Sequence, residues 1–181
     1  MVIGEVVHAS VDEDYAGGYE KRYGEDGFMM LVRKAERSEL MAVHKIVVTT
    51  VSEIYPHYYP KGTVDFFLSH HSEKNIMDDL EAGRVFLCFD NGHHITGTVT
   101  VKGNEICRLF VLPEYQGNGY GKGMLEFAEE TIAADYSEVS VDVSLAAKGI
   151  YRKRGYREIS YHIIETESGD YLCYDTILKK L

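Results

Sequence analysis

Residues 109–125 read Leu-Phe-Val-Leu-Pro-Glu-Tyr-Gln-Gly-Asn-Gly-Tyr-Gly-Lys-Gly-Met-Leu. An apolar run ends at Pro113, glycines stand at positions 117, 119 and 121, and the apolar residues of 122–134 recur at helical spacing. The stretch therefore predicts a strand, a glycine turn and a helix. Glycines at such a junction allow a tight turn and leave backbone N–H groups uncovered at the positive end of the helix dipole. This is a favourable place for a phosphate group to bind.

Two known phosphate-binding patterns do not fit this turn. A P-loop requires a glycine at the position of Gln116 and a hydroxyl residue at the position of Gly123. The dinucleotide pattern G-x-G-x-x-G requires its last glycine where the chain has Lys122 or Met124. Taken alone, the stretch could also be a glycine turn before an amphipathic helix that binds no ligand.

The pattern that fits is Gln/Arg-x-x-Gly-x-Gly/Ala, formed by Gln116, Gly119 and Gly121 after Leu-x-Val-x-Pro at 109–113. It resembles the acetyl-CoA pyrophosphate loop of the GCN5-related N-acetyltransferases (GNAT). The resemblance implies acetyl-CoA as the cosubstrate, held by the end of the strand, by the turn and by one residue further along the chain. The residues so implied are Leu109, Phe110, Val111, Gln116, Gly117, Asn118, Gly119, Tyr120, Gly121, Lys122 and Ser144.

A second segment, 147–156, reads Ala-Lys-Gly-Ile-Tyr-Arg-Lys-Arg-Gly-Tyr and resembles the family's Ala-x-x-Leu-Tyr-x-Lys-x-Gly-Phe. The resemblance implies that Tyr151 is the catalytic general acid, which protonates the departing thiolate. Packing of the ring on a short helix is the alternative. The family usually has Asn where this chain has Ser144, so this coenzyme contact is either lost or bridged by water.

Glu105 is the candidate general base. It occupies the position that matches the catalytic glutamate of the histone-modifying members of the family. Its position next to the Gly103-Asn104 turn also suits an exposed charge at the start of a strand, and both interpretations stay open.

The acceptor site is expected in the segment 55–63, where two prolines and a glycine end the preceding helix. Four of its side chains, Tyr55, His57, Tyr58 and Tyr59, are candidate substrate-binding residues. Tyrosine rings offer a face to a cation and their hydroxyls can orient an amine. The alternative is that these tyrosines cap the core beneath a proline-rich turn.

Composition limits the classes of function. The length of 181 residues suits one N-acetyltransferase domain with a core at 28–181, while residues 1–27 are either a partly mobile leader or an arm packed on the domain. A net charge of −10 argues against nucleic acid and suits a cationic substrate. No apolar run approaches the roughly 20 residues of a membrane span, so we expect a cytoplasmic protein without a membrane partner.

The cysteines and histidines suggest no metal. Cys88, Cys107 and Cys173 lie in apolar stretches without C-x-x-C spacing, which is typical of buried thiols in a reducing compartment. The eight histidines show no metal-ligand spacing; among them, His57, His70 and His71 are competitors for the role of base.

Periodicity predicts the remaining elements. A strand is expected at 28–35, a helix from near Ser38 to Ile54 and a second helical region at 64–80. Strands at 84–90, 95–101 and 105–112 are joined by a type I′ turn at Asn91-Gly92 and by a turn at Gly103-Asn104. The last elements are a parallel strand at 139–143, a helix at 146–154 capped by Gly155, and strands at 156–164 and 171–178.

The order β-α-α-β-β-β-α-β-α-β-β is the acetyltransferase topology, as the resemblance has it. It implies an α/β (α+β) fold, in which helices flank a central, mixed, mostly antiparallel twisted sheet whose strands splay apart at the acetyl-CoA site. The expected activity is direct transfer of an acetyl group from acetyl-CoA to a primary amine of a small molecule or peptide. A non-catalytic acyl-CoA-binding or regulatory domain is the main alternative, and transfer to an oxygen nucleophile or of a longer acyl chain is a third. A homodimer is possible.

Overall fold

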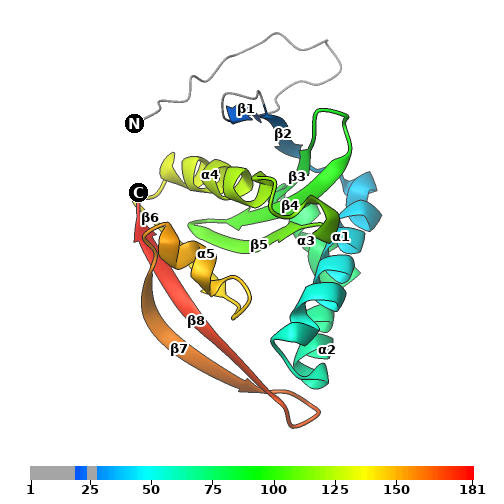
Figure 1. Cartoon of the computed structure of the whole chain (residues 1–181), viewed down its shortest axis with the longest axis vertical. Coiled ribbons are helices and arrows are strands. Elements are labelled where there is room, and N and C mark those ends of the chain that lie inside the picture. Colours follow the sequence, from blue (N-terminus) through cyan, green and yellow to red (C-terminus); the bar gives the residue numbers. More distant parts are fainter. Residues whose placement is uncertain (1–18, 24–27) are drawn as a thin grey trace.

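The structure is a computed structural model that describes residues 19–23 and 28–181 (Figure 1). Its strands are β1 (Tyr19–Tyr23), β2 (Phe28–Lys34), β3 (Val85–Phe89), β4 (Ile95–Lys102), β5 (Glu105–Val111), β6 (Glu138–Val143), β7 (Arg157–Glu165) and β8 (Tyr171–Lys180). Its helices are α1 (Leu40–Ile54), α2 (Lys61–His70), α3 (Glu73–Glu81), α4 (Tyr120–Ala133) and α5 (Lys148–Lys153).

The described strands form one sheet in the order β1-β2-β3-β4-β5-β6-β8-β7. Every neighbouring pair is antiparallel except β5 and β6, which are parallel because α4 connects them. These two strands pair at a single position, Glu105 with Ser140, and then diverge (Figure 1). The mixed, mostly antiparallel sheet predicted from the sequence is confirmed.

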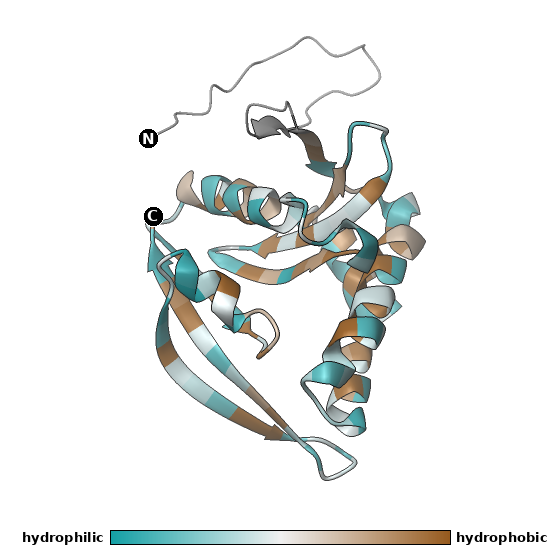
Figure 2. Ribbon diagram, in the orientation of Figure 1, coloured by the Kyte–Doolittle hydropathy of each residue, from teal (hydrophilic) through white to brown (hydrophobic). Residues whose placement is uncertain are grey.

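Helices cover both faces of the sheet. One core cluster joins α4 to the sheet through Met124, Leu125 and Val139, and it includes Tyr151 of α5. The other cluster lies under α1, α2 and α3. Apolar colouring follows the strands and the sides of the helices that face them (Figure 2). In the part of the chain that the structure describes, no helix is long and apolar enough to span a membrane.

A bulge in β5 decides which side chains share a face. Val101 pairs with Ile106 and Thr100 with Arg108, so Cys107 is one extra residue on β5. In a regular strand two residues three positions apart point to opposite faces. The extra residue shifts the alternation, and Glu105 and Arg108 therefore point to the same face.

Two local predictions were wrong in detail. The helical region expected at 64–80 is two helices, because the Ser72 hydroxyl accepts the backbone N–H of Asn75 and caps α3. The link between β3 and β4 is not a type I′ turn at Asn91-Gly92. The Asp90 carboxylate accepts N–H groups from Gly92 and His94 at 2.8 Å each, and the positive φ falls on His93.

The segment before the predicted core is partly an arm of the sheet. Tyr19–Tyr23 pairs antiparallel with β2, which agrees with the packed-arm alternative for these five residues. The rest of the predicted leader, residues 1–18 and 24–27, lies outside the described residues.

Candidate functional site

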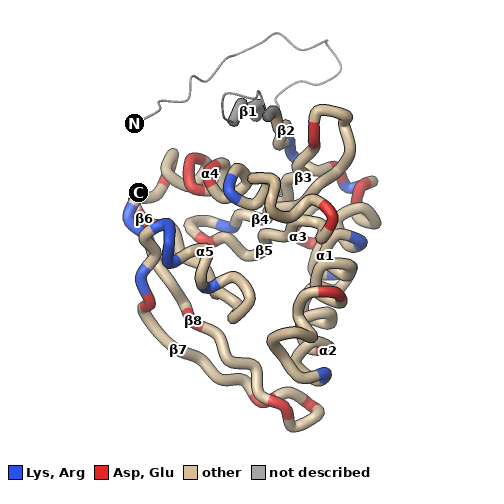
Figure 3. Tube along the Cα trace, in the orientation of Figure 1, with Lys and Arg blue, Asp and Glu red and all other residues tan. Residues whose placement is uncertain are grey.

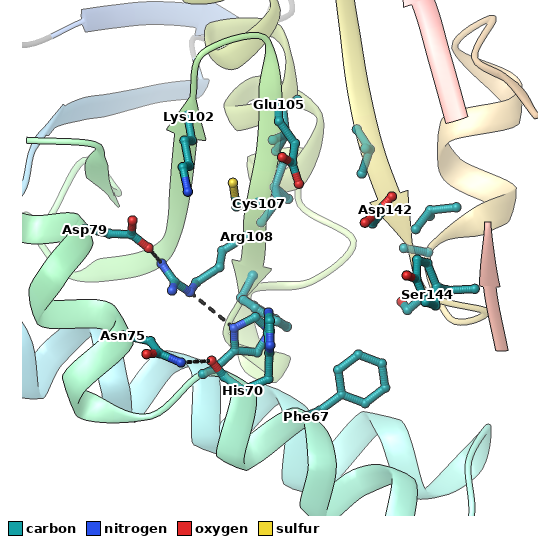
Figure 4. Close-up of a pocket in the computed structure, with 18 of the residues that line it drawn as sticks. Phe67, His70, Asn75, Asp79, Lys102, Glu105, Cys107, Arg108, Asp142 and Ser144 are labelled. Carbon is teal, nitrogen blue, oxygen red and sulfur yellow. Dashed lines mark hydrogen bonds and ion pairs between the residues drawn. The ribbon is translucent and has the colours of Figure 1, made fainter. Parts of the chain in front are cut away.

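A cavity of about 550 Å³ lies where β5 and β6 diverge. Its lining comes from these two strands and the segment after β6, from α2 and α3, and from the β7–β8 hairpin (Figure 4). The predicted residues that line it are Tyr55, Glu105, Leu109, Phe110, Ser144 and Tyr151. The divergence of the strands thus brings the predicted acid, the predicted base and part of the predicted coenzyme set onto one cavity.

The glycine turn lies between the end of β5 and the start of α4. Gly117 and Gly119 have φ of +80° and +92°, and Gly119 is the N-cap residue of the helix. Such angles favour glycine. A Cβ added at Gly117 would meet no atom within 4 Å, so the space next to this glycine is open. The first-turn N–H groups of a helix have no acceptors within the helix, so this turn can bind an anion.

Gln116 ties the turn to the sheet. Its side-chain amide donates to the carbonyl of Val111 at 3.0 Å, and the Thr50 hydroxyl donates to the same carbonyl at 3.2 Å. The Val111 carbonyl is therefore engaged inside the protein. Neither Val111 nor the turn residues 116–122 line the cavity.

Tyr151 is buried beside Tyr156, with the ring centroids 5.1 Å apart and the rings nearly perpendicular. Burial raises the pKa of Tyr151 well above its ordinary value of 10, so the hydroxyl stays protonated at physiological pH. The Tyr151 side chain is part of the cavity lining.

Ion pairs hold the helix that carries Tyr151. Basic residues gather at α5 (Figure 3), although the chain is acidic overall. Lys148 pairs with Asp175 at 2.6 Å, and Arg154, just after the helix, pairs with the buried Glu129 of α4 at 3.0 Å. A helix of this length is marginal by itself, so these contacts with β8 and α4 stabilise it.

Glu105 faces Asp142 across the gap between β5 and β6 (Figure 4). Burial and the nearby charge of Asp142 raise the pKa of Glu105, and the ammonium of Lys102 opposes the shift. A carboxylate with a raised pKa is a stronger base than an ordinary one. Sequence reasoning did not single out Asp142.

Ser144 is engaged on the inner side of the cavity. The Tyr55 hydroxyl donates to its Oγ at 3.4 Å, and burial raises the pKa of Tyr55. The shorter side chain at this position is thus already bonded within the protein.

The four aromatic residues predicted for the acceptor site form a buried pair and an exposed pair. Tyr55 and Tyr59 are buried, and the Tyr59 hydroxyl accepts the N–H of Leu145 at 2.6 Å. Burial raises the pKa of Tyr59 to about 12. His57 and Tyr58 are exposed, and of the four residues only Tyr55 lines the cavity. The buried pair fits the core-capping alternative, and the substrate role of the set stays a prediction.

Sequence reasoning missed a charged network on the α2–α3 side of the cavity. Arg108 is buried and donates to Asp79 Oδ2 at 2.7 Å, to Thr100 Oγ1 at 3.2 Å and to His71 Nδ1 at 3.2 Å. The signal was an arginine inside the apolar run of β5, which must find partners when it is buried. His71 had been considered only as a base. Burial and the charge of Arg108 lower the pKa of His71 to about 3, so it is neutral.

No group of three or more His, Cys, Asp or Glu side chains in the described ranges could hold a metal ion. The fold and the site together define an α/β domain in which two parallel strands of the sheet diverge. The first of these strands is followed by a glycine turn of a kind that can bind an anion.

Comparison with known proteins identifies the family. A model described as an acetyltransferase (GNAT) domain matches residues 54–167, more than half of the chain. The chain therefore belongs to the GNAT acetyltransferase family. A search of curated proteins found no match.

Solved structures agree on the fold. A GCN5-related N-acetyltransferase from Rhodopseudomonas palustris is similar with a TM-score of 0.76 and 22% identity, over 83% of this chain and 94% of that one. The PaiA N-acetyltransferase from Thermoplasma acidophilum, solved with coenzyme A, gives 0.62 and 18% over 84% and 99%. The ribosomal-protein-S18-alanine N-acetyltransferase from Escherichia coli gives 0.61 and 20% over 84% and 94%. At such identities the likeness shows the fold alone.

Proposed function

We propose that this protein is an acetyl-CoA-dependent N-acetyltransferase that transfers the acetyl group directly to a primary amine of a small molecule or peptide. The observation that carries the proposal is that Glu105 and Tyr151 both line one cavity at the opened sheet. Membership of the GNAT family supports it.

Acetyl-CoA would be held by the backbone. Its pyrophosphate would accept N–H groups of residues 117–122 at the start of α4, where the dipole is positive. Its pantetheine arm would lie between β5 and β6, where the divergence leaves the β6 side of β5 without a partner strand along Leu109 and Phe110. The neighbour solved with coenzyme A has the same fold.

The chain's own residues would move two protons. Glu105, directly or through water, would take a proton from the acceptor ammonium, because a protonated amine has no free electron pair for attack. The C–N bond then forms, and the C–S bond breaks as Tyr151 would donate its hydroxyl proton to the sulfur. The nitrogen would release its second proton as the amide forms, and this proton, carried by water, would restore the Tyr151 hydroxyl. Acetyl-CoA supplies the activated acyl group.

One observation favours a second candidate, a non-catalytic acyl-CoA-binding or regulatory domain. Ser144 is shorter than the usual Asn and is already bonded to Tyr55, which weakens one expected coenzyme contact. Such a domain would bind acetyl-CoA and release no thiol with any acceptor.

The test is a panel of primary amines with acetyl-CoA, read by release of free thiol, with coenzyme binding measured in parallel by calorimetry. Thiol release that depends on the amine supports transfer. Coenzyme binding without release across small amines and peptides would favour the regulatory candidate.

The remaining expectations belong to the same proposal. The net charge of −10 suits a cationic acceptor and opposes nucleic acid as a partner, in keeping with a cytoplasmic enzyme. Cell fractionation checks the location, and light scattering after size-exclusion chromatography decides between monomer and homodimer.

A further inference from the structure

The α2–α3 side of the cavity holds a histidine whose protonation pattern is set by its neighbours. Asp79 of α3 accepts one N–H of Arg108 (Figure 4), and Arg108 Nε donates to His71 Nδ1. Because Nδ1 accepts a hydrogen bond, the proton of the neutral ring must be on Nε2. Arg108 and His71 are each 6% exposed, so bulk water does not replace these bonds.

The His71 side chain is part of the cavity lining, and no hydrogen bond joins its Nε2 atom to a residue that the structure describes. The ring packs edge to face on Phe110, which also lines the cavity, with centroids 5.4 Å apart. A neutral imidazole with its proton on Nε2 therefore forms part of an aromatic wall of the cavity.

This donor and the proposed base face the same space. The bulge at Cys107 turns Glu105 and Arg108 to one face of the sheet, and Arg108 holds His71 over that face. An acceptor whose amine approaches Glu105 thus has His71 Nε2 farther along its length. The donor can be satisfied only by a hydrogen-bond acceptor, and an ammonium group has none.

We infer that His71 is a specificity-determining residue, which selects amine acceptors that carry an oxygen atom able to accept a hydrogen bond, and that Arg108 and Asp79 position it. The oxygen is a hydroxyl, carbonyl or carboxylate oxygen, and simple alkylamines and polyamines lack it. This inference rests on the proposed function, since it assigns a substrate class to the same cavity.

The first experiment reads binding and needs no acetyl transfer. The chain with isotope-labelled histidine, saturated with coenzyme A at neutral pH, is titrated with straight-chain amino alcohols and with the alkylamines in which a methyl group replaces the hydroxyl. We expect His71 to be the neutral Nε2–H form and its Nε2 resonance to move with the amino alcohols only. An Nδ1–H ring, a charged ring, a resonance that moves with coenzyme A alone, or equal shifts with both series would overturn the inference.

The second experiment reads selectivity in the thiol-release assay. His71→Phe should raise the acceptor KM of the amino alcohols by about tenfold, the effect of one lost hydrogen bond, and leave that of the alkylamines and of acetyl-CoA unchanged. His71→Gln keeps an N–H donor and should restore part of the preference. His44→Phe is the matched control, because His44 does not line the cavity.

The positioning role of Arg108 is tested separately, by the tautomer of His71. Arg108→Lys should release the His71 ring from the Nε2–H form, which a purely structural role would not do, and thermal melting shows whether the variant is folded. Unchanged selectivity in folded His71→Phe refutes the inference. If the wild type releases no thiol with any amine, the proposed function fails, and the titration still decides whether His71 recognises an oxygen.

Discussion

The proposed site has two sides that are built in different ways, the glycine turn outside the cavity lining and a wall of the cavity itself. The glycine-turn side, residues 116–122 with the end of β5, offers backbone N–H groups and two glycines at positive φ. The arginine-network side, Arg108 with Asp79, Thr100 and His71, offers side chains from β5, α3, β4 and the link after α2. Backbone groups can hold a part common to many substrates, while side chains can be varied to choose one acceptor.

Tyr151 lines the cavity, and its removal should have the largest effect. Tyr151→Phe keeps the ring that packs on Tyr156 and removes the proton donor, so kcat should fall by about a hundredfold or more with little change in coenzyme affinity. Steady-state kinetics and calorimetry measure the two quantities. Tyr136→Phe, at an exposed position away from the cavity, is the control and should behave as wild type. An unchanged rate of a limiting chemical step would leave Tyr151 with a packing role.

A substitution on the glycine-turn side should have the second largest effect. Gly119→Glu adds a negative charge and a side chain at φ of +92°, and should weaken acetyl-CoA binding by about ten- to a hundredfold while the acceptor side is spared. Gly169→Glu is the matched control, because Gly169 also has positive φ and open space around it, but lies in the β7–β8 turn. Equal affinity of folded Gly119→Glu and wild type for the coenzyme, by calorimetry, would rule out this turn as the pyrophosphate site.

The gap between β5 and β6 holds Glu105, and the activity should therefore depend on pH. A base must be deprotonated, so kcat/KM should fall as pH drops through the raised pKa of Glu105. Asp142→Asn removes a negative charge that raises this pKa, and the acid limb of the profile should move to lower pH. Glu165→Gln, on the exposed edge strand and outside the cavity lining, should leave the limb in place. If the acid limb of the kcat/KM profile is the same in Asp142→Asn as in wild type, a group other than Glu105 is responsible for the limb.

The smallest effect is expected at the aromatic loop. Tyr59→Phe leaves the N–H of Leu145 without its acceptor and should lower the free energy of unfolding by about 1–2 kcal/mol. Tyr58→Phe, at an exposed position in the same loop, should change stability little. Denaturant unfolding measures both. If instead Tyr58→Phe raises the acceptor KM, the loop has the substrate role first predicted for it.

The sequence by itself determined the elements and the glycine-turn side. Apolar periodicity indicates which face of a helix or strand is buried, and glycines at a strand-to-helix junction indicate backbone angles that other residues avoid. Both signals are local, so the strand, turn and helix around residues 109–125 were predicted within a few residues. The prediction of a type I′ turn was wrong because the Asp90 carboxylate, outside the Asn91-Gly92 pair, accepts N–H groups of Gly92 and His94 and so sets a different loop conformation.

Only the tertiary structure decided the arginine-network side. His71, Asp79 and Arg108 have no common spacing in the chain, and their meeting depends on the break between α2 and α3 and on the bulge at Cys107. A bulge reverses the facing of every later residue in its strand, yet it leaves no distinct pattern in the sequence. The same holds for Tyr58 and Tyr59, adjacent residues of which the fold exposes one and buries the other.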